Sequence, residues 1–297
     1  MKIFDCFMFY DEDLILDLRL NILNKYVDKF VIVESKFTHS GEERKLLFNK
    51  NKYKTFESKI AYIVLENEPS GLSEIKADDT FHHKNSKYIM NAVRRENYQR
   101  NSILKGLANA KSDDLIIISD VDEIPNLSIL NQEKISNQIL LFKQNFYYYK
   151  FNLKLENTPW YGSKACLFKN LKSPQWLRNT KNKRYPWWRL DVFFSKKKYT
   201  NIKFIDNGGW HFSNVKTAEQ LEKKMRTYLH HREYDIKPLG KEKIKKIMNS
   251  KKSIYNLKVD MRDDKFDGKQ DLIVSDFKEL PNYIYENKDK YLNWLEK

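Results

Sequence analysis

The sequence predicts an α/β fold in which a mostly parallel central sheet is flanked by helices. Short, continuous apolar runs alternate with segments in which apolar residues recur at helical spacing, so the first 125 residues consist of strand–helix–strand units. Of the 297 residues, 41% are hydrophobic, enough for a sizeable core. With only 8 Gly and 7 Pro, the chain shows no linker. We therefore expect one continuous domain.

The first half supplies four expected strands, each a short apolar run followed by polar residues. These runs cover residues 2–9, 30–35, 60–65 and 115–119. The run FVIVES (30–35) has the continuous apolar character of a strand buried on both faces of a parallel sheet. Asp11 to Asp13 are placed to cap a first helix, and a second helix is expected from about Asn91 to Ala110.

The sequence after residue 125 is more aromatic at first and then more basic. Further strand segments are expected in residues 139–153, 165–168, 201–205 and 207–213. Thr217 and Gln220 have the spacing of a capping box, which predicts that a helix begins there. We accordingly divide the single domain into a first half (1–125), a mixed part (126–215) and a basic, helical C-terminal region (216–297).

The charge balance favours anionic partners. The 55 Lys and Arg against 40 Asp and Glu give a net charge of +15. The excess lysine is spread along the chain, so we expect no nucleic-acid partner and favour a phosphorylated substrate or an anionic membrane surface. No apolar run is long enough to span a bilayer. Cys6 and Cys166 show no disulfide or metal spacing, so we expect a cytoplasmic protein that contacts membranes at most peripherally.

The stretch LIIISDVDEIP (115–125) ends an apolar run with Asp120, Asp122 and Glu123. At the carboxyl end of a parallel strand, these residues lie where open α/β sheets bind ligands. In an extended segment Asp120 and Asp122 point to one side and Val121 points to the core. Two neighbouring carboxylates repel unless a cation lies between them, and Mg²⁺ or Mn²⁺ prefers such oxygen ligands. The pattern predicts a divalent-metal site, with an acidic turn as the alternative.

Two metal-dependent reactions use such a pair of aspartates. In one, a sugar leaves a nucleotide diphosphate, and the metal neutralises the charge that builds on the diphosphate. In the other, an aspartate transfers a phosphoryl group, as in haloacid-dehalogenase-like phosphatases, but these carry the pair after the first strand and not after the fourth. A basic nucleic-acid-binding or membrane-binding protein without catalysis is the third alternative.

Four blocks in order resemble glycosyltransferase family 17, which includes N-acetylglucosaminyltransferases that act on N-glycans. The blocks are DCFMFYDEDLILDLRLNILNKYVDKFVIVES (5–35), RRENYQRNSILKGL (94–107), DDLIIISDVDEIP (113–125) and GGWHFS (208–213). The resemblance implies a GT-A fold, a nucleoside-diphosphate sugar donor, a divalent metal and inversion at the anomeric carbon. It makes residues 1–125 the nucleotide-sugar-binding half and residues 126–215 the acceptor half.

The resemblance also assigns residues to the donor and the metal. It implies metal ligands at Asp120, Asp122 and His211. It implies donor contacts at Glu34, Ser35, Gln99, Arg100, Asn101, Asp120 and Glu123. The planar guanidinium of Arg100 suits phosphate oxygens. Glu123 either orients the donor sugar or holds the turn.

An inverting transferase needs a general base to accept the proton of the attacking hydroxyl. Asp191 is the preferred candidate because it follows the aromatic and basic cluster YPWWRL. The alternatives are Glu156, Asp206 and Glu233. The group Trp160, Trp187 and Trp188 is expected either to form a platform for the acceptor sugar or to pack against the sheet.

The chain departs from the glycoprotein-modifying members in one respect. Those members carry an N-terminal membrane anchor, whereas this sequence begins directly at its first expected strand. We therefore expect a bacterial or viral enzyme whose acceptor is a glycan or glycolipid. UDP-GlcNAc is the leading donor that the resemblance suggests.

Overall fold

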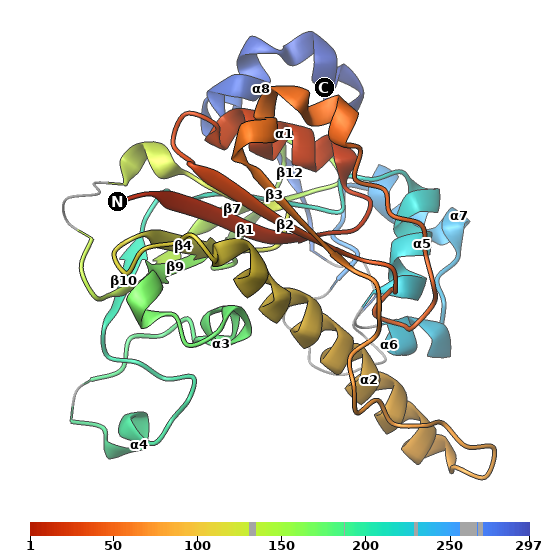
Figure 1. The fold of residues 1–297 in the computed structure, drawn as a ribbon. Coiled ribbons are helices and arrows are strands. Elements are labelled where there is room, and N and C mark those ends of the chain that lie inside the picture. Colours follow the sequence, from red (N-terminus) through yellow and green to blue (C-terminus); the bar gives the residue numbers. More distant parts are fainter. Residues whose placement is uncertain (131–134, 187, 229–230, 256–265, 267–269) are drawn as a thin grey trace.

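The protein forms two β-sheets surrounded by helices, as the computed structural model in Figure 1 shows. The structure describes residues 1–130, 135–186, 188–228, 231–255, 266 and 270–297. The α/β class agrees with the prediction from the sequence. The division into two sheets was not predicted, and it determines where the polar residues after the fourth strand lie.

The first sheet has seven strands in the order β10-β6-β9-β4-β1-β2-β3. Its strands are β1 (Ile3–Phe9), β2 (Lys29–Ser35), β3 (Ile60–Leu65), β4 (Leu115–Ile118), β6 (Ile139–Phe142), β9 (Lys164–Leu167) and β10 (Ile202–Ile205). Strands β3, β2, β1 and β4 run parallel, as do β6 and β10, while β9 is antiparallel to both of its neighbours. The sheet is therefore mostly parallel, as expected.

The second sheet has five strands in the order β12-β8-β7-β11-β5. Its strands are β5 (Glu123–Pro125), β7 (Gln144–Tyr148), β8 (Leu153–Trp160), β11 (Gly209–Ser213) and β12 (Ile273–Val274). The expected strand segment 139–153 thus contains two strands and the first residue of β8, and Lys143 alone separates β6 in one sheet from β7 in the other. The apolar run gave no sign of this division, because both strands are buried.

Helices cover both faces of the first sheet (Figure 1). The α-helices are α1 (Asp13–Leu23), α2 (Phe81–Asn101), α3 (Pro174–Asn179), α4 (Leu190–Phe193), α5 (Ala218–Thr227), α6 (His231–Ile236), α7 (Lys241–Asn249) and α8 (Asn282–Glu286), with 3₁₀ turns at Lys50–Lys59, Ser102–Leu107, Leu127–Ile129, Phe168–Asn170, Phe277–Glu279 and Lys288–Trp294. Helices α1 and α8 lie on one face, and α2 and α3 on the other. Among the described helices, none has the length and apolar character needed to cross a bilayer.

Two helix starts differ from the prediction. Helix α2 begins ten residues earlier than expected, because the side chain of Thr80 accepts a hydrogen bond from His83 N and starts a polar, exposed first half. Helix α1 begins after Glu12, whose side chain accepts from the backbone of Tyr10 and Asp11 rather than capping the helix. The capping box of α5 at Thr217 and Gln220 is confirmed.

Three clusters of buried side chains form the core. One lies between the first sheet and α1, and the C-terminal residues around α8 complete it. A second lies on the opposite face, under the 3₁₀ turn that follows α2. The third fills the space between the second sheet and helices α5 and α7. The chain from β4 to β5 passes from the first sheet to the second, so the residues between them lie at the junction of these layers.

Candidate functional site

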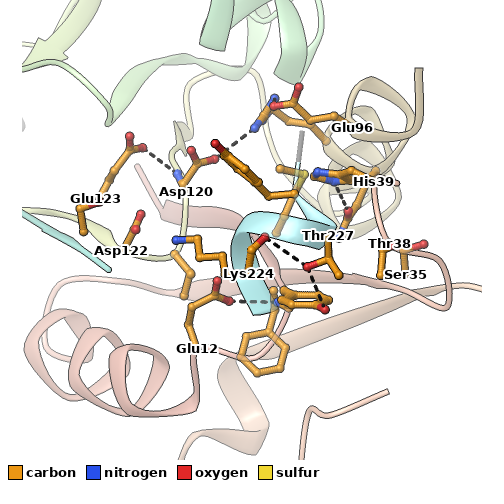
Figure 2. A pocket seen from close by; sticks show the side chains of 18 of the residues that line it. Glu12, Ser35, Thr38, His39, Glu96, Asp120, Asp122, Glu123, Lys224 and Thr227 are labelled. Atoms are coloured by element: carbon orange, nitrogen blue, oxygen red, sulfur yellow. Dashed lines mark hydrogen bonds and ion pairs between the residues drawn. The ribbon is translucent and has the colours of Figure 1, made fainter. Parts of the chain in front are cut away.

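A cavity of about 470 Å³ opens at the carboxyl ends of β1, β2 and β4. Figure 2 shows Asp120, Asp122 and Glu123 together in it, with Lys224 of α5 pointing toward the same space. The segment after β4 is a turn, closed by a hydrogen bond from Glu123 N to Asp120 O of 3.0 Å. The expectation of an extended segment was wrong, although Val121 does point into the core. The acidic turn formed by residues 120–123 is therefore part of the cavity wall.

Asp120 is held by two arginines. Its Oδ2 accepts from Arg178 Nη2 at 2.7 Å, and its Oδ1 accepts from Arg100 Nη2 at 3.1 Å. Burial would raise the pKa of Asp120, but these guanidinium groups outweigh burial and hold the pKa well below its usual range. At Asp120, the guanidinium groups of Arg100 and Arg178 therefore offset the repulsion from the neighbouring acids.

Glu123 organises the turn from a fully buried position. Its carboxylate accepts from Asp120 N at 2.7 Å and from Trp160 Nε1 at 2.6 Å. Arg178 approaches both carboxylate oxygens, at 2.6 and 3.0 Å, in the paired geometry that guanidinium and carboxylate favour. A Cβ on Gly162 would lie 2.0 Å from Glu123 Cδ, so only glycine leaves room for this carboxylate. Glu123 holds the turn and the arginine in place.

Arg19 of α1 supports the same turn from the core side. It is fully buried and forms an ion pair with Asp5 of β1, with 2.6 Å between Nη2 and Oδ1. Its Nη1 donates to the carbonyl oxygens of Asp120, Val121 and Glu123 at 2.8–3.1 Å. These bonds satisfy backbone carbonyls that would otherwise be buried without partners. The turn is thus fixed by Arg19 through its backbone and by Arg178 through its side chains.

Asp122 lies beside His211 of β11, because β5, which begins right after Asp122, pairs with β11 in the second sheet. His211 Nε2 lies 3.7 Å from Asp122 Oδ1. The imidazole ring packs against Phe146, at a centroid distance of 4.4 Å, and against Trp160, at 4.8 Å, and these two rings also contact each other at 5.2 Å. Burial would raise the pKa of Asp122, but the nearby His211 and Lys224 (on α5) lower it. The carboxylate therefore remains ionised and can bind a cation.

The donor atoms of this pair fit one divalent ion. Two ligands that each lie about 2.1 Å from an ion can be at most ~4.2 Å apart, so a separation of 3.7 Å is compatible with shared coordination. His211 Nδ1 is buried without a hydrogen-bond partner in the described structure, and the two stacked rings orient the imidazole instead. Asp120 lies on the other side of the turn, and each of its two oxygens already has an arginine partner. The described residues accordingly contain no cluster of three or more metal-binding side chains.

Lys164 supports the helix that carries Arg178. Its Nζ donates to the carbonyl oxygens of Arg178 and Thr180 at the end of α3, at 2.7 and 2.5 Å. Lys164 is 5% exposed, and burial together with the neighbouring Arg178 lowers its pKa to about 7. A positive or neutral amine can donate these two bonds, so α3 stays anchored in either state.

Several cavity residues were missed by the analysis of the sequence. These are Glu12, His39, Arg44, Glu96, Arg178 and Lys224. Lys224 Nζ donates to Asn214 Oδ1 at 3.2 Å and forms no salt bridge with any carboxylate in the described part of the chain. For Arg178 a signal existed: Ser173 followed by Pro174 predicts a helix start, and the structure shows Ser173 capping α3. Nothing local in the sequence could show that α3 reaches the turn.

The expected donor-contact residues are divided between the cavity and its surroundings. Ser35, Gln99 and Arg100 line the cavity with Asp120 and Glu123. Glu34 is buried beneath it, where its carboxylate accepts from Arg44, Tyr62 and the backbone of Leu47 and Phe48. Asn101 lies outside the lining, and its side chain accepts from Gln175 N of α3. The side chains of Glu34 and Asn101 thus bind other groups of the protein and do not line the cavity.

Three of the four expected general bases lie away from the cavity. Asp191 is exposed near α4 and paired with Arg189 and Lys198, both of which lower its pKa to about 2. Asp206, at 3.4 Å from Lys143, and Glu156 are exposed on other surfaces. Glu233 belongs to α6, and its side chain is outside the described part of the structure.

The three tryptophans do not form one platform in the described structure. Trp160 lines the cavity and stacks on His211. Trp188 is 66% exposed in the segment around α4, which does not line the cavity. Trp187 lies outside the described residues.

The amino-acid sequence that forms this cavity is similar to sequences of known proteins. The family model for glycosyltransferase family 17 matches residues 1–295. The chain belongs to glycosyltransferase family 17. Within that family, the chain is 32% identical over 117 residues to the human, rat and mouse proteins named β-1,4-mannosyl-glycoprotein 4-β-N-acetylglucosaminyltransferase. The match covers 37% of this chain and 19% of each relative, so it spans about a fifth of their length.

Proposed function

We propose that this chain is a metal-dependent, inverting glycosyltransferase of the GT-A type, which moves a sugar from a UDP-sugar to a hydroxyl of a glycan or glycolipid. The observation that carries the proposal is the pairing of Asp122 with His211 at 3.7 Å in a cavity at the carboxyl ends of parallel strands. Open α/β sheets bind nucleotides at such an edge. Membership of family 17 supports transfer of a sugar rather than of a phosphoryl group.

In this proposal Asp122 and His211 hold the divalent ion, Mn²⁺ or Mg²⁺. When bound, the ion would neutralise charge that develops on the leaving diphosphate. Lys224 provides a second positive charge at the same edge, since its ammonium group is not taken up by a carboxylate of the described chain. Arg178 and Arg100 keep Asp120 ionised and fixed, so the turn needs no rearrangement to accept the donor.

The names of the relatives suggest the donor. All three are N-acetylglucosaminyltransferases by name, and we therefore propose UDP-GlcNAc as the sugar donor. Asp191 is not part of the proposed machinery, because its carboxylate is ion-paired on an exposed segment outside the cavity. Glu12 and Glu96 are carboxylates that do line it.

A thermal-shift measurement with UDP and UDP-GlcNAc, with and without Mn²⁺, tests the proposal. We expect Mn²⁺-dependent stabilisation by UDP, together with slow release of UDP from UDP-GlcNAc. Asp122→Asn and His211→Ala should each lose the Mn²⁺-dependent part of the shift. Asp206→Asn is the matched control, since this aspartate is exposed outside the cavity, and it should behave as the wild type.

Two results would contradict the proposal. Equal Mn²⁺-dependent stabilisation in wild type and Asp122→Asn would remove the metal role of Asp122. Release of phosphate from a simple phosphomonoester, without any effect of UDP compounds on stability, would favour the phosphatase alternative.

A further inference from the structure

The segment 181–199, here called the basic loop, extends away from both sheets around α4 (Figure 1). It contains seven basic residues and one acid, Asp191, a net charge of +6. The basic residues are Lys181, Lys183, Arg184, Arg189, Lys196, Lys197 and Lys198. Such a concentration of one sign on a projecting segment creates a local positive potential that attracts anionic surfaces.

The basic loop is a closed structure with an aromatic centre. Backbone hydrogen bonds join its two ends, from Lys181 N to Lys197 O at 2.8 Å and from Tyr185 N to Tyr199 O at 3.5 Å. The buried ring of Tyr185 lies 5.5–5.8 Å from the cationic groups of Lys183, Arg189 and Lys198. These contacts join the two ends of the loop and gather three of its basic side chains around one ring.

Two large aromatic side chains of this loop are exposed. Trp188 is 66% exposed, and Phe194 is 89% exposed. Two exposed aromatic side chains on one short, projecting loop are a candidate interaction surface. Aromatic rings beside lysines have the composition of segments that enter the boundary between lipid headgroups and acyl chains.

The charges of the loop are not all used internally. Asp191 binds Arg189 and Lys198. Lys196 and Lys197 are exposed, and neither is within salt-bridge distance of a carboxylate in the described residues. Their ammonium groups therefore remain available to an external anion. A lysine near an anionic bilayer adds about 1 kcal/mol of attraction, roughly a fivefold gain in binding.

We propose that the basic loop docks the protein on an anionic lipid bilayer. Trp188 and Phe194 enter the headgroup region, and Lys196 and Lys197 contact the anionic headgroups. The loop follows α3 in the chain, and α3 carries Arg178 of the cavity lining. The docking surface does not depend on the proposed reaction, and it can be tested without a sugar donor.

Co-sedimentation with vesicles tests the proposal on the full chain. We expect binding to vesicles that contain phosphatidylglycerol, little binding to phosphatidylcholine alone, and strong weakening between about 0.1 and about 0.5 M salt. Trp188→Ser with Phe194→Ser should weaken binding about tenfold or more. Lys196→Glu with Lys197→Glu should weaken it at least as much, because each reversal replaces attraction with repulsion.

Matched controls lie on other surfaces of the molecule. Tyr285→Ser with Leu292→Ser removes two exposed apolar side chains near the C-terminus, and Lys243→Glu with Lys245→Glu reverses two exposed charges on α7. Both controls should bind vesicles like the wild type. Lipids brominated near the headgroup should quench tryptophan emission in the wild type, and less in Trp188→Phe.

Any of three outcomes would overturn the proposal. The first is no binding to anionic vesicles at low salt. The second is an equal loss of binding in the α7 charge control, which would indicate attraction through net charge alone. The third is full vesicle binding by the Trp188→Ser/Phe194→Ser variant, which would exclude entry of the rings. Circular dichroism of each variant separates a lost surface from a lost fold.

Discussion

The turn after β4 and the basic loop are both rich in charge, but they use it in opposite ways. Around the turn, three buried or half-buried arginines are each paired with a carboxylate. These are Arg19, Arg100 and Arg178. In the basic loop, two exposed aromatic rings and the exposed lysines Lys196 and Lys197 accompany a single acid, Asp191, which is itself exposed. Buried, paired charges fix geometry and resist screening by salt, whereas exposed charges remain free to meet a partner.

The largest expected effect is at the core side of the turn. Arg19→Met would leave Asp5 buried without its partner and three carbonyl groups without their donor. We expect a loss of about 3–5 kcal/mol in the free energy of unfolding, measured by denaturant titration. Arg189→Met in the basic loop is the matched control, with stability close to the wild type. A small effect at Arg19 would show that the turn does not depend on this ion pair.

Gly162→Ala displaces the Glu123 carboxylate without removing its charge, and so tests whether its position matters. The new methyl group would meet the Glu123 carboxylate and displace it from Arg178, Trp160 and Asp120 N. We expect a loss of about 1–3 kcal/mol in unfolding free energy and weaker Mn²⁺-dependent binding of UDP. In Gly240→Ala no atom lies near the added Cβ, so only strain from the positive φ should appear, and UDP binding should be retained. Normal UDP binding in Gly162→Ala would contradict the role given to Glu123.

Lys164 is expected to make the stability of the folded protein depend on pH. Its pKa of about 7 in the folded protein lies below the value of about 10.4 in an unfolded chain. Between these values the unfolded state binds a proton that the folded state has released, so stability rises with pH. Relative to Lys164→Met, the wild type should gain up to ~1.4 kcal/mol per pH unit from about pH 7 to about pH 9. An equal change in unfolding free energy with pH in the wild type and in Lys164→Met would contradict the lowered pKa.

The smallest effect is expected at Asp191. Asp191→Asn breaks exposed ion pairs with Arg189 and Lys198 and touches nothing in the cavity. We expect unchanged melting temperature and unchanged release of UDP from UDP-GlcNAc, with somewhat tighter binding to anionic vesicles because one negative charge is removed. A large loss of UDP release would restore Asp191 as the general base that the sequence suggested.

Periodicity predicted most of the first sheet. The apolar runs at 30–35 and 60–65 match β2 and β3 to within one residue. For β2 the physical reason is that a strand buried on both faces must be apolar throughout. The second sheet escaped prediction, since Lys143 separates two buried strands and nothing in composition marks a change of sheet there. Helix α2 was shortened in the prediction because its exposed first half has no apolar stripe.

The acids of the site were visible in the sequence, but their partners were not. Asp120 and Asp122 stand out because they follow an apolar run. Arg19 lies among leucines in α1, where periodicity alone assigns it no partner, and its contacts with the turn span about a hundred residues. Arg178 and Lys224 come from short or distant helices. Contacts between residues far apart in the chain depend on how the layers stack, and local patterns do not encode that.

The chain passes from the first sheet to the second three times, between β4 and β5, β6 and β7, and β10 and β11. Asp122 lies in the first passage, and His211 lies just beyond the third, so an ion held between them would join two of these passages. Because β5 and β11 already pair in the second sheet, such an ion would cross-link two neighbouring strands of that sheet. We therefore expect the amide hydrogens of β5 and β11 to exchange more slowly when it is bound, with little change in β2 or β3 of the first sheet.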